Sequence, residues 1–276
     1  MKNLLIILST FLISLIIISC KSSDDGSTST DNTTTDNTTS SSELFVAVGD
    51  NGTILTSSDG TTWTSRTSGS SDNFSNVHYT NELLVIRGDS GTILTSSDGI
   101  SWTSRESGSS NKLKGISYGN DLFVISGDSG TIITSSDGIT WTSRTSGTSN
   151  NLRKVIFENE LFVVLGKTGT ILTSSDGITW TSRTSGTSNF LRGVTYANST
   201  FVTVGDNGTI LTSTDATTWT SRTSGTSNNL RRVPYGKSTF VIVGNSGTIL
   251  TSSDATTWTS RTSGTGNNLN GVRYIE

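Results

Sequence analysis

The sequence contains few of the residues on which most metal and nucleophile chemistry depends. Its 276 residues include one histidine, one cysteine, one methionine and one proline. A structural zinc site needs about four His or Cys ligands, so His78 and Cys20 cannot form one, and we predict no metal or cofactor. Cys20 directly follows an apolar segment with the features of a targeting sequence, which also excludes a Cys/His nucleophile pair. We therefore interpret His78 as an ordinary strand residue.

Hydrophobicity and net charge are also low. Hydrophobic residues make up 30% of the chain, and the formal net charge is −3. Binding to a nucleic-acid backbone needs a concentrated positive surface, so a nucleic-acid partner is not predicted. The apolar residues come in short β-branched runs bounded by glycine and aspartate. This pattern is typical of an all-β domain rather than of a disordered chain.

One long apolar run is present, at the start of the chain. Residues 4–18 are nearly all apolar, a length that suits a signal peptide better than a membrane span. Ile17-Ile18-Ser19-Cys20 follows and resembles the lipobox of bacterial lipoproteins. The resemblance implies that residues 1–19 are a lipoprotein signal peptide and that Cys20 carries acyl chains, which anchor the protein to a membrane. An ordinary signal peptide with an unrelated cysteine is the alternative.

Residues 20–42 comprise the cysteine and a segment rich in Ser, Thr, Asp and Asn. After Cys20 this segment has no aliphatic or aromatic residue. It cannot offset the entropy of ordering, so we expect a disordered tether. The lipoprotein resemblance places the protein in the bacterial cell envelope. Lys21 after the cysteine, rather than an aspartate, indicates the outer membrane within the same resemblance.

The remaining residues, 43–276, divide into six repeats of 39 residues. A strict period of this length is typical of a solenoid, a propeller or an array. The fourth repeat has four strand-like pieces, at 162–166, 170–174, 179–183 and 192–197, with short turns rich in Gly, Asp and Asn between them. Four antiparallel strands per repeat predict a six-bladed β-propeller, most simply a monomeric domain. A β-helix is the alternative, although its rungs are usually shorter.

Residues 43–276 begin with a second strand of a blade and end just after a first strand. We therefore expect Val272–Ile275 to join the N-terminal blade and close the ring, so that no sheet edge is exposed.

Each repeat also carries an aspartate followed four residues later by a tryptophan. Ser57-x-Asp59-Gly60-x-x-Trp63 resembles the Asp-box, or BNR repeat, of sialidases and many non-catalytic propellers. The wider repeat is similar to that of photosystem II stability factor-type propellers. The resemblance implies a structural role, in which the carboxylate accepts backbone N–H groups and the indole packs between sheets. The pairs are Asp59 and Trp63, Asp98 and Trp102, Asp137 and Trp141, Asp176 and Trp180, Asp215 and Trp219, and Asp254 and Trp258.

Cations recur at the start of the first strand in four successive repeats, whereas the other two repeats have Ser75 and Asn270 there. First strands line the channel of a propeller, so these side chains are expected at one channel mouth, where they suit an anionic or polyhydroxylated ligand. Solvated side chains multiplied by duplication are the alternative interpretation. The candidate binding residues are Lys114, Arg153, Lys154, Arg192, Arg231 and Arg232.

The remaining question is whether the propeller binds or catalyses. A catalytic site is asymmetric, so its residues should depart from the repeat consensus. The departures are dispersed among the repeats and contain no evident carboxylate pair, so we predict no catalytic residue. The function indicated is a non-catalytic binding or scaffold module for a protein or glycan-like partner. A sialidase-like glycoside hydrolase is the alternative.

Overall fold

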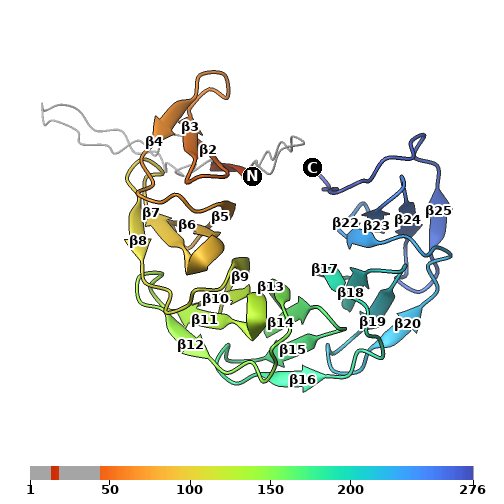
Figure 1. The fold of residues 1–276 in the computed structure, drawn as a ribbon. Coiled ribbons are helices and arrows are strands. Elements are labelled where there is room, and N and C mark those ends of the chain that lie inside the picture. The colour runs from red at the N-terminus through yellow and green to blue at the C-terminus, as the bar shows by residue number, and fades with distance from the viewer. Residues whose placement is uncertain (1–13, 19–43, 276) are drawn as a thin grey trace, which may run out of the picture.

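The computed structural model describes residues 14–18 and 44–275 of the chain. They form six antiparallel sheets that succeed one another around a central axis (Figure 1). Nearly all regular structure is strand, and the helical segments are two single 3-10 turns. An all-β propeller with four-stranded antiparallel blades is therefore confirmed. Within these residues, no helix is long and apolar enough to cross a membrane.

The blades follow the order of the repeats. The first contains β1 (Ser14–Ile18), β2 (Leu44–Val48), β3 (Ile54–Ser57) and β4 (Thr64–Arg66). The second contains β5 (Phe74–Thr80), β6 (Leu83–Gly88), the 3-10 turn η1 (Asp89–Gly91), β7 (Ile93–Ser96) and β8 (Thr103–Arg105). The third contains β9 (Leu113–Gly119), β10 (Leu122–Gly127), the 3-10 turn η2 (Asp128–Gly130), β11 (Ile132–Ser135) and β12 (Thr142–Arg144).

The other three blades repeat this plan. The fourth contains β13 (Leu152–Glu158), β14 (Leu161–Gly166), β15 (Ile171–Ser174) and β16 (Thr181–Arg183). The fifth contains β17 (Leu191–Ala197), β18 (Thr200–Gly205), β19 (Ile210–Ser213) and β20 (Thr220–Arg222). The sixth contains β21 (Leu230–Arg232), β22 (Tyr235–Gly236), β23 (Thr239–Gly244), β24 (Ile249–Ser252) and β25 (Thr259–Arg261).

The inner strand of the sixth blade is split into β21 and β22 at Pro234. Proline has no N–H and cannot donate to a ladder. Its carbonyl oxygen still accepts the N–H of Val241 at 3.0 Å, so the split strand stays on the sheet.

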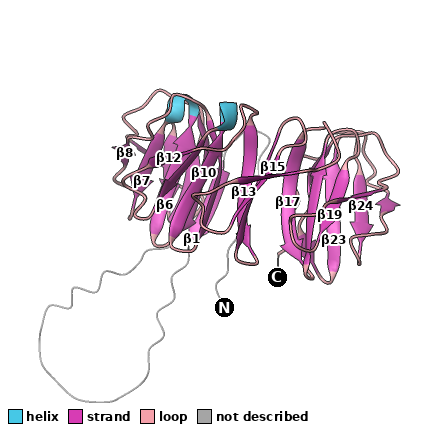
Figure 2. Cartoon of the chain, turned by 90° about the horizontal axis from the view of Figure 1, so that it is seen from below, coloured by secondary structure: helices cyan, strands magenta, loops and turns pink. Residues whose placement is uncertain are grey.

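Each blade is a meander that runs from an inner strand beside the axis to an outer strand at the rim (Figure 1). Two-residue loops join the inner strand to the second strand in blades two to six. In the fifth blade this loop is Asn198-Ser199, whose φ angles are 48° and 54°. Positive φ at both loop residues defines the type I′ turn, whose twist matches that of the flanking strands. The two 3-10 turns lie at one end of the blades (Figure 2).

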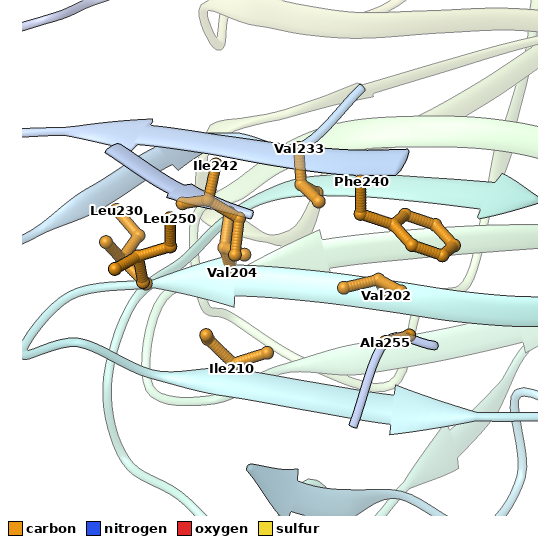
Figure 3. Close-up of a cluster of buried hydrophobic side chains, with 9 residues drawn as sticks. All are labelled: Val202, Val204, Ile210, Leu230, Val233, Phe240, Ile242, Leu250 and Ala255. Carbon is orange, nitrogen blue, oxygen red and sulfur yellow. The ribbon is translucent and has the colours of Figure 1, made fainter. Parts of the chain in front are cut away.

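The core is divided among the boundaries between neighbouring blades. Between the fifth and sixth blades, Val202, Val204 and Ile210 pack against Phe240 and Ile242 (Figure 3). Equivalent clusters fill the other four boundaries from the first blade to the fifth. Because each apolar strand face is buried by the next repeat, the blades support one another in sequence.

The sixth boundary, between the last blade and the first, differs from the prediction. Residues 269–275 form no strand, and the inner position of the first blade is occupied by β1, which pairs antiparallel with β2. The five clusters of buried residues include none across this boundary in the described residues. Closure of the ring by the C-terminal strand is thus not shown and stays a prediction.

Candidate binding site in the central channel

The inner strands of blades two to six share a β-bulge close to their first residue. In the fifth blade, Leu191 pairs with Gly205 and Gly193 pairs with Val204, so Arg192 is the extra residue. A bulge redirects the side chain of the extra residue and bends the strand. The repeat thus places one residue per blade on a bulge at the same end of the channel. These residues are Ser75, Lys114, Arg153, Arg192 and Arg231.

Most of these bulge residues have partners in their own blade. Lys114 forms an ion pair with Asp128 in the following turn. Arg192 binds Asp206 through two guanidinium nitrogens, with the Nη2–Oδ2 distance at 3.0 Å. In the sixth blade, Asn245 takes the aspartate position and accepts the Nε–H of Arg231 at 2.7 Å. In these blades the mouth cations are thus paired with the turn 14 residues later.

The fourth blade breaks this pairing. The turn residue 14 positions after Arg153 is Lys167, a like charge, where the third and fifth blades have aspartate. The Nε atom of Arg153 is buried and has no hydrogen-bond partner in the described structure. Its guanidinium carbon lies 5.8 Å from the centre of the Phe190 ring, a cation–π distance. Arg153 is therefore a mouth cation without a carboxylate.

A cavity of about 770 Å³ lies in the channel and extends to the mouth, where Ser75, Lys114 and Arg153 line it. That size is within the range of small-molecule sites. It is lined by residues from several blades, and five residues that depart from the repeat consensus meet there. These are His78, Arg87, Lys154, Glu158 and Arg232. The sequence pattern, which disperses these residues over three repeats, does not reveal that they converge.

Arg87 is the most buried cation of this group, with an exposed fraction of 6%. It occupies a position on β6 that is aliphatic in the other blades, except for Ser126 in the third. Its Nε donates to the carbonyl oxygen of Lys114 at 2.8 Å. Its Nη1 is buried and finds no hydrogen-bond partner among the described residues. A buried guanidinium donor without an acceptor costs free energy that a bound anion would recover.

Lys154 and Arg232 occupy equivalent positions on the inner strands of the fourth and sixth blades. In the third and fifth blades the position is glycine, at Gly115 and Gly193. A Cβ on Gly115 would lie 2.9 Å from the Cα of Lys154, and one on Gly193 would lie 3.4 Å from the Cα of Arg232. Glycine therefore lets the neighbouring inner strand approach closely. Long cations in alternate blades, separated by glycines, thus fit into one channel.

The electrostatics reflect an excess of positive charge. Burial, together with the nearby charges of Arg232, Arg153 and Arg87, lowers the pKa of Lys154 to about 8. Burial and the charges of Arg87 and Lys154 lower the pKa of His78 to about 4, so this imidazole is neutral at pH 7. Burial also raises the pKa of Glu158, which favours its uncharged form. The lowered pKa values of Lys154 and His78 are those expected where cations outnumber anions in a confined space, whereas the raised pKa of Glu158 is an effect of burial alone.

The lining offers little for glycoside cleavage. Its carboxylates are Asp50 and Glu158, and no tyrosine lines the cavity within the described part of the chain. Asp50 belongs to the turn after β2, and Glu158 ends β13, so the two carboxyl groups come from different blades and opposite strand ends. The cavity is instead suited to binding a negatively charged group.

The aspartate–tryptophan turns lie away from the channel, between the third and fourth strands of each blade. In the third blade, Oδ1 of Asp137 accepts the N–H groups of Ile139 and Thr140 at 2.8 and 2.9 Å. The indole N–H of Trp141 donates to the carbonyl oxygen of Gly138 at 3.2 Å. These bonds lie within the turn, so the side chains stabilise the blade itself.

The fifth and sixth blades keep this turn although alanine replaces glycine. Ala216 and Ala255 have φ angles of 56° and 59°, in the left-handed region. The indole N–H of Trp219 still donates to the carbonyl oxygen of Ala216, at 3.0 Å. The turn hydrogen bonds thus hold alanine in a conformation that it rarely adopts.

Comparison with known proteins supports the β-propeller fold and assigns no function. Residues 112–230 match the family described as DUF6242 beta propeller domain. No curated protein matches the chain. Two similar solved structures are YCF48 bound to D1 peptide, 20% identical with a TM-score of 0.62, and YCF48 from Cyanidioschyzon merolae, 19% identical with a TM-score of 0.63. The first comparison covers 79% of this chain and 76% of the other, and the second 84% and 85%.

A third similar structure is the computationally designed Ika8 protein, which is 14% identical. Its TM-score is 0.69, over 84% of this chain and 75% of the other. The protein is thus of the β-propeller class, with repeated antiparallel blades around a cation-lined channel. At these identities the likeness concerns the fold alone.

Proposed function

We propose that this protein is a non-catalytic binding module whose channel mouth accepts an acidic segment of a partner protein. The observation that supports it best is the set of cations lining the cavity that have no carboxylate partner among the described residues, namely Arg87, Arg153, Lys154 and Arg232. An acidic segment would supply the missing negative charge and gain charge-assisted hydrogen bonds. A propeller of similar fold, YCF48, has been solved with a bound D1 peptide, which makes a peptide partner a reasonable first choice.

The original candidate residues divide into two groups within this proposal. Arg153, Lys154 and Arg232 are the primary contacts. Lys114, Arg192 and Arg231 already bind Asp128, Asp206 and Asn245, so they would add mainly long-range attraction.

We further propose that the module is held at the bacterial envelope by acyl chains on Cys20, with residues 21–42 as a tether. Cys20 and the tether lie outside the described residues, so this rests on the lipobox resemblance and on composition. Replacing Cys20 by alanine should move the protein from the membrane fraction to the soluble fraction. An unchanged distribution, with no acyl mass on Cys20, would contradict the anchor.

The binding function is tested with acidic peptides and matched peptides in which glutamine replaces each glutamate. Binding to the detergent-solubilised full chain should require the acidic residues and weaken as salt is raised. Arg153→Ala combined with Arg232→Ala should weaken it by about tenfold or more, since each removes a charged donor. Arg105→Gln with Arg144→Gln, on outer strands, is the matched control and should bind like the parent.

Three other results would redirect the proposal. Equal binding of the acidic and neutral peptides would exclude an electrostatic mouth. A glycan that binds where no peptide does would replace the protein partner by the glycan-like one. Turnover of chromogenic glycosides, sialosides included, that is lost with Glu158→Gln would favour the hydrolase alternative instead.

A further inference from the structure

The cavity contains an arrangement of charges that the mouth residues alone do not explain. Arg87 comes from the second strand of blade two, Lys154 from the inner strand of blade four and Arg232 from the inner strand of blade six. All three line the same cavity. The three residues thus come from alternate blades, and these blades lie on different sides of the axis, as the labels β6, β13 and β22 in Figure 1 show.

The donors in this space are already oriented. The Nε of Arg87 is fixed to the carbonyl oxygen of Lys114, which leaves its buried Nη1 as the free end of the guanidinium group. Arg232 donates from its Nη1 to the carbonyl oxygen of Arg231 at 3.4 Å, a weak bond. Arg153 brings a second buried nitrogen, its Nε, that has no partner in the part of the chain that the structure describes. Guanidinium groups match pairs of oxygen atoms on carboxylate and phosphate groups.

The charge is not balanced by nearby side chains. Lys154 is influenced by Arg232, Arg153 and Arg87, all of the same sign. Among lining residues within the described structure, Asp50 and Glu158 are the carboxylates, and the pKa of Glu158 is raised. A single negative charge would leave this cluster still strongly positive, whereas a group with two or three charges would come close to balancing it.

We propose that the cavity is a specific site for a small multivalent oxyanion, a di- or tricarboxylate or a phosphate-type group, held by Arg87, Lys154 and Arg232 with Arg153 at the entrance. This site shares Arg153, Lys154 and Arg232 with the peptide contacts proposed above, but it does not require the partner protein. The oxyanion could be free in solution or be carried at the tip of a larger ligand, and the two sources share the same chemistry.

Three features make the assignment specific to this cavity. Arg87, Lys154 and Arg232 replace residues that are uncharged in the other blades, so they do not follow from the repeat consensus. Arg87 stands where four other blades have valine or leucine. Lys154 and Arg232 stand where the third and fifth blades have glycine. Lys167 removes the carboxylate that would otherwise neutralise Arg153, since the turn position is aspartate in the neighbouring blades.

The repeat itself supplies well-tolerated test variants. Arg87→Val and Lys154→Gly restore residues that equivalent positions of other blades already use, so they should fold. Lys167→Asp should give Arg153 the partner that Arg192 has in Asp206. Arg105→Gln, on outer strand β8, removes a cation far from the cavity. Its amide can still bond to Thr95, which accepts the Nε–H of Arg105 at 2.8 Å.

The experiment titrates citrate, pyrophosphate and inorganic phosphate into the full chain in detergent, by calorimetry and thermal melting, at constant ionic strength set with chloride. At least one probe should bind the parent one-to-one and raise its Tm in a saturable way. Arg87→Val and Lys154→Gly should each weaken binding about tenfold or more, and Lys167→Asp should weaken it by less. Arg105→Gln should bind like the parent.

Other outcomes separate this proposal from the previous one. If no probe binds, or if Arg87→Val and Lys154→Gly bind as the parent does, the oxyanion site is wrong. Acidic peptides that still bind through Arg153 would leave the proposed function intact. If Arg87→Val fails to fold, Lys154→Gly alone decides. Competition between an acidic peptide and the bound probe would identify the oxyanion as a group carried by the partner, whereas independent binding would identify a free anion.

Discussion

Within the described residues, five of the six boundaries between blades are closed by clusters of buried side chains, and the sixth is open. At the closed boundaries, strand faces of one blade pack on the next in clusters such as Val163, Leu165 and Ile171 against Leu191 and Phe201. At the open boundary the same repeat positions are present but remain partly exposed. They are Val241 and Ile249 in the sixth blade and Phe45 and Leu55 in the first. The two kinds of boundary thus have similar residues and different packing.

The first blade differs from the other five in the segment that pairs with the inner edge of its second strand, β2. In blades two to six this edge of the second strand is covered by the inner strand of the same repeat, whereas β2 pairs with β1. Tyr274 nevertheless lies against Gly236, where an added Cβ would be 2.1 Å from the ring, and Phe157 lies against Gly119 in the same way. The C-terminal segment is thus already seated on the sixth blade as an inner strand would be.

We expect these two segments to compete for the same edge of β2. Residues 14–18 lie in the segment that the lipobox resemblance predicts to be removed from the mature protein. After their removal, the edge of β2 would be free for residues 271–275. We expect the mature protein to close its ring in the register of the other blades, with Val272 opposite Ala47 as Val194 is opposite Thr203. Three predictions test this comparison, in order of decreasing effect.

Loss of the C-terminal segment should have the largest effect, and only in the processed chain. In a chain that starts at Cys20, deletion of residues 269–276 should remove an inner strand and about 3 kcal/mol, which lowers Tm by about 6–12 °C. In the full chain, where β1 covers β2, the same deletion should cost much less. Thermal melts of the full chain and of the chain that starts at Cys20, each with and without residues 269–276, measure the two losses of Tm. Equal losses with and without residues 1–19 would show that the two segments do not compete.

Phenylalanine truncation compares a closed boundary with the open one. Phe162→Ala should lower the free energy of unfolding by about 3–5 kcal/mol, since this buried ring fills the boundary of blades three and four. Phe45 is the equivalent residue at the open boundary. Phe45→Ala should cost about 1 kcal/mol in the full chain and approach the value of Phe162→Ala once the ring is closed. Denaturant unfolding provides both values, and a small cost in the processed chain would indicate a permanently open ring.

Acidification should have the smallest effect on Tm. It should act on all blades alike, because each blade has one of the Asp–Trp turns. Backbone N–H groups of Thr140 and Ile139, and the Ser135 hydroxyl, lower the pKa of Asp137 to about 2. The aspartates of the other turns are shifted in the same direction. A lowered carboxylate pKa contributes stability above the ordinary value near 4, and this stability is lost as the pH falls through the shifted pKa.

Tm should therefore fall progressively between about pH 4 and 2. Because these carboxylates are exposed, each contributes little, and Asp137→Ala should cost about 1 kcal/mol or less at pH 7. This variant should also lose part of its dependence on acid. A Tm that is independent of pH over this range would mean that the turn hydrogen bonds do not require charged aspartate.

Much of the fold could be predicted from the sequence because the repeat records local interactions. The expected strands at 162–166 and 170–174 correspond to β14 and β15 to within a residue, since short apolar runs bounded by Gly-rich turns define hairpins locally. The shared position of Lys114, Arg153 and Arg192 at one end of the channel could also be predicted, because equivalent residues of a repeat occupy equivalent places in the blades.

The cavity could not be predicted in this way. Arg87, Lys154 and Arg232 are far apart in the chain and occupy two different repeat positions, so no spacing pattern connects them. The pairing of Arg192 with Asp206, and the lack of a carboxylate at Arg153, could have been inferred from the constant interval of 14 residues. The interval becomes meaningful only once the bulge is seen to direct these side chains toward the following turn.

The sequence by itself determined the repeating unit, its four strands and its hydrogen-bonded Asp–Trp turns. Each of these depends on residues within about one repeat, whose hydrogen bonds and hairpins form locally. Only the tertiary structure decided which cations are neutralised, which are left buried without acceptors, and which blade boundary is open. These depend on contacts between side chains and strands that are distant in the chain, and such contacts are set by how the blades pack around the axis.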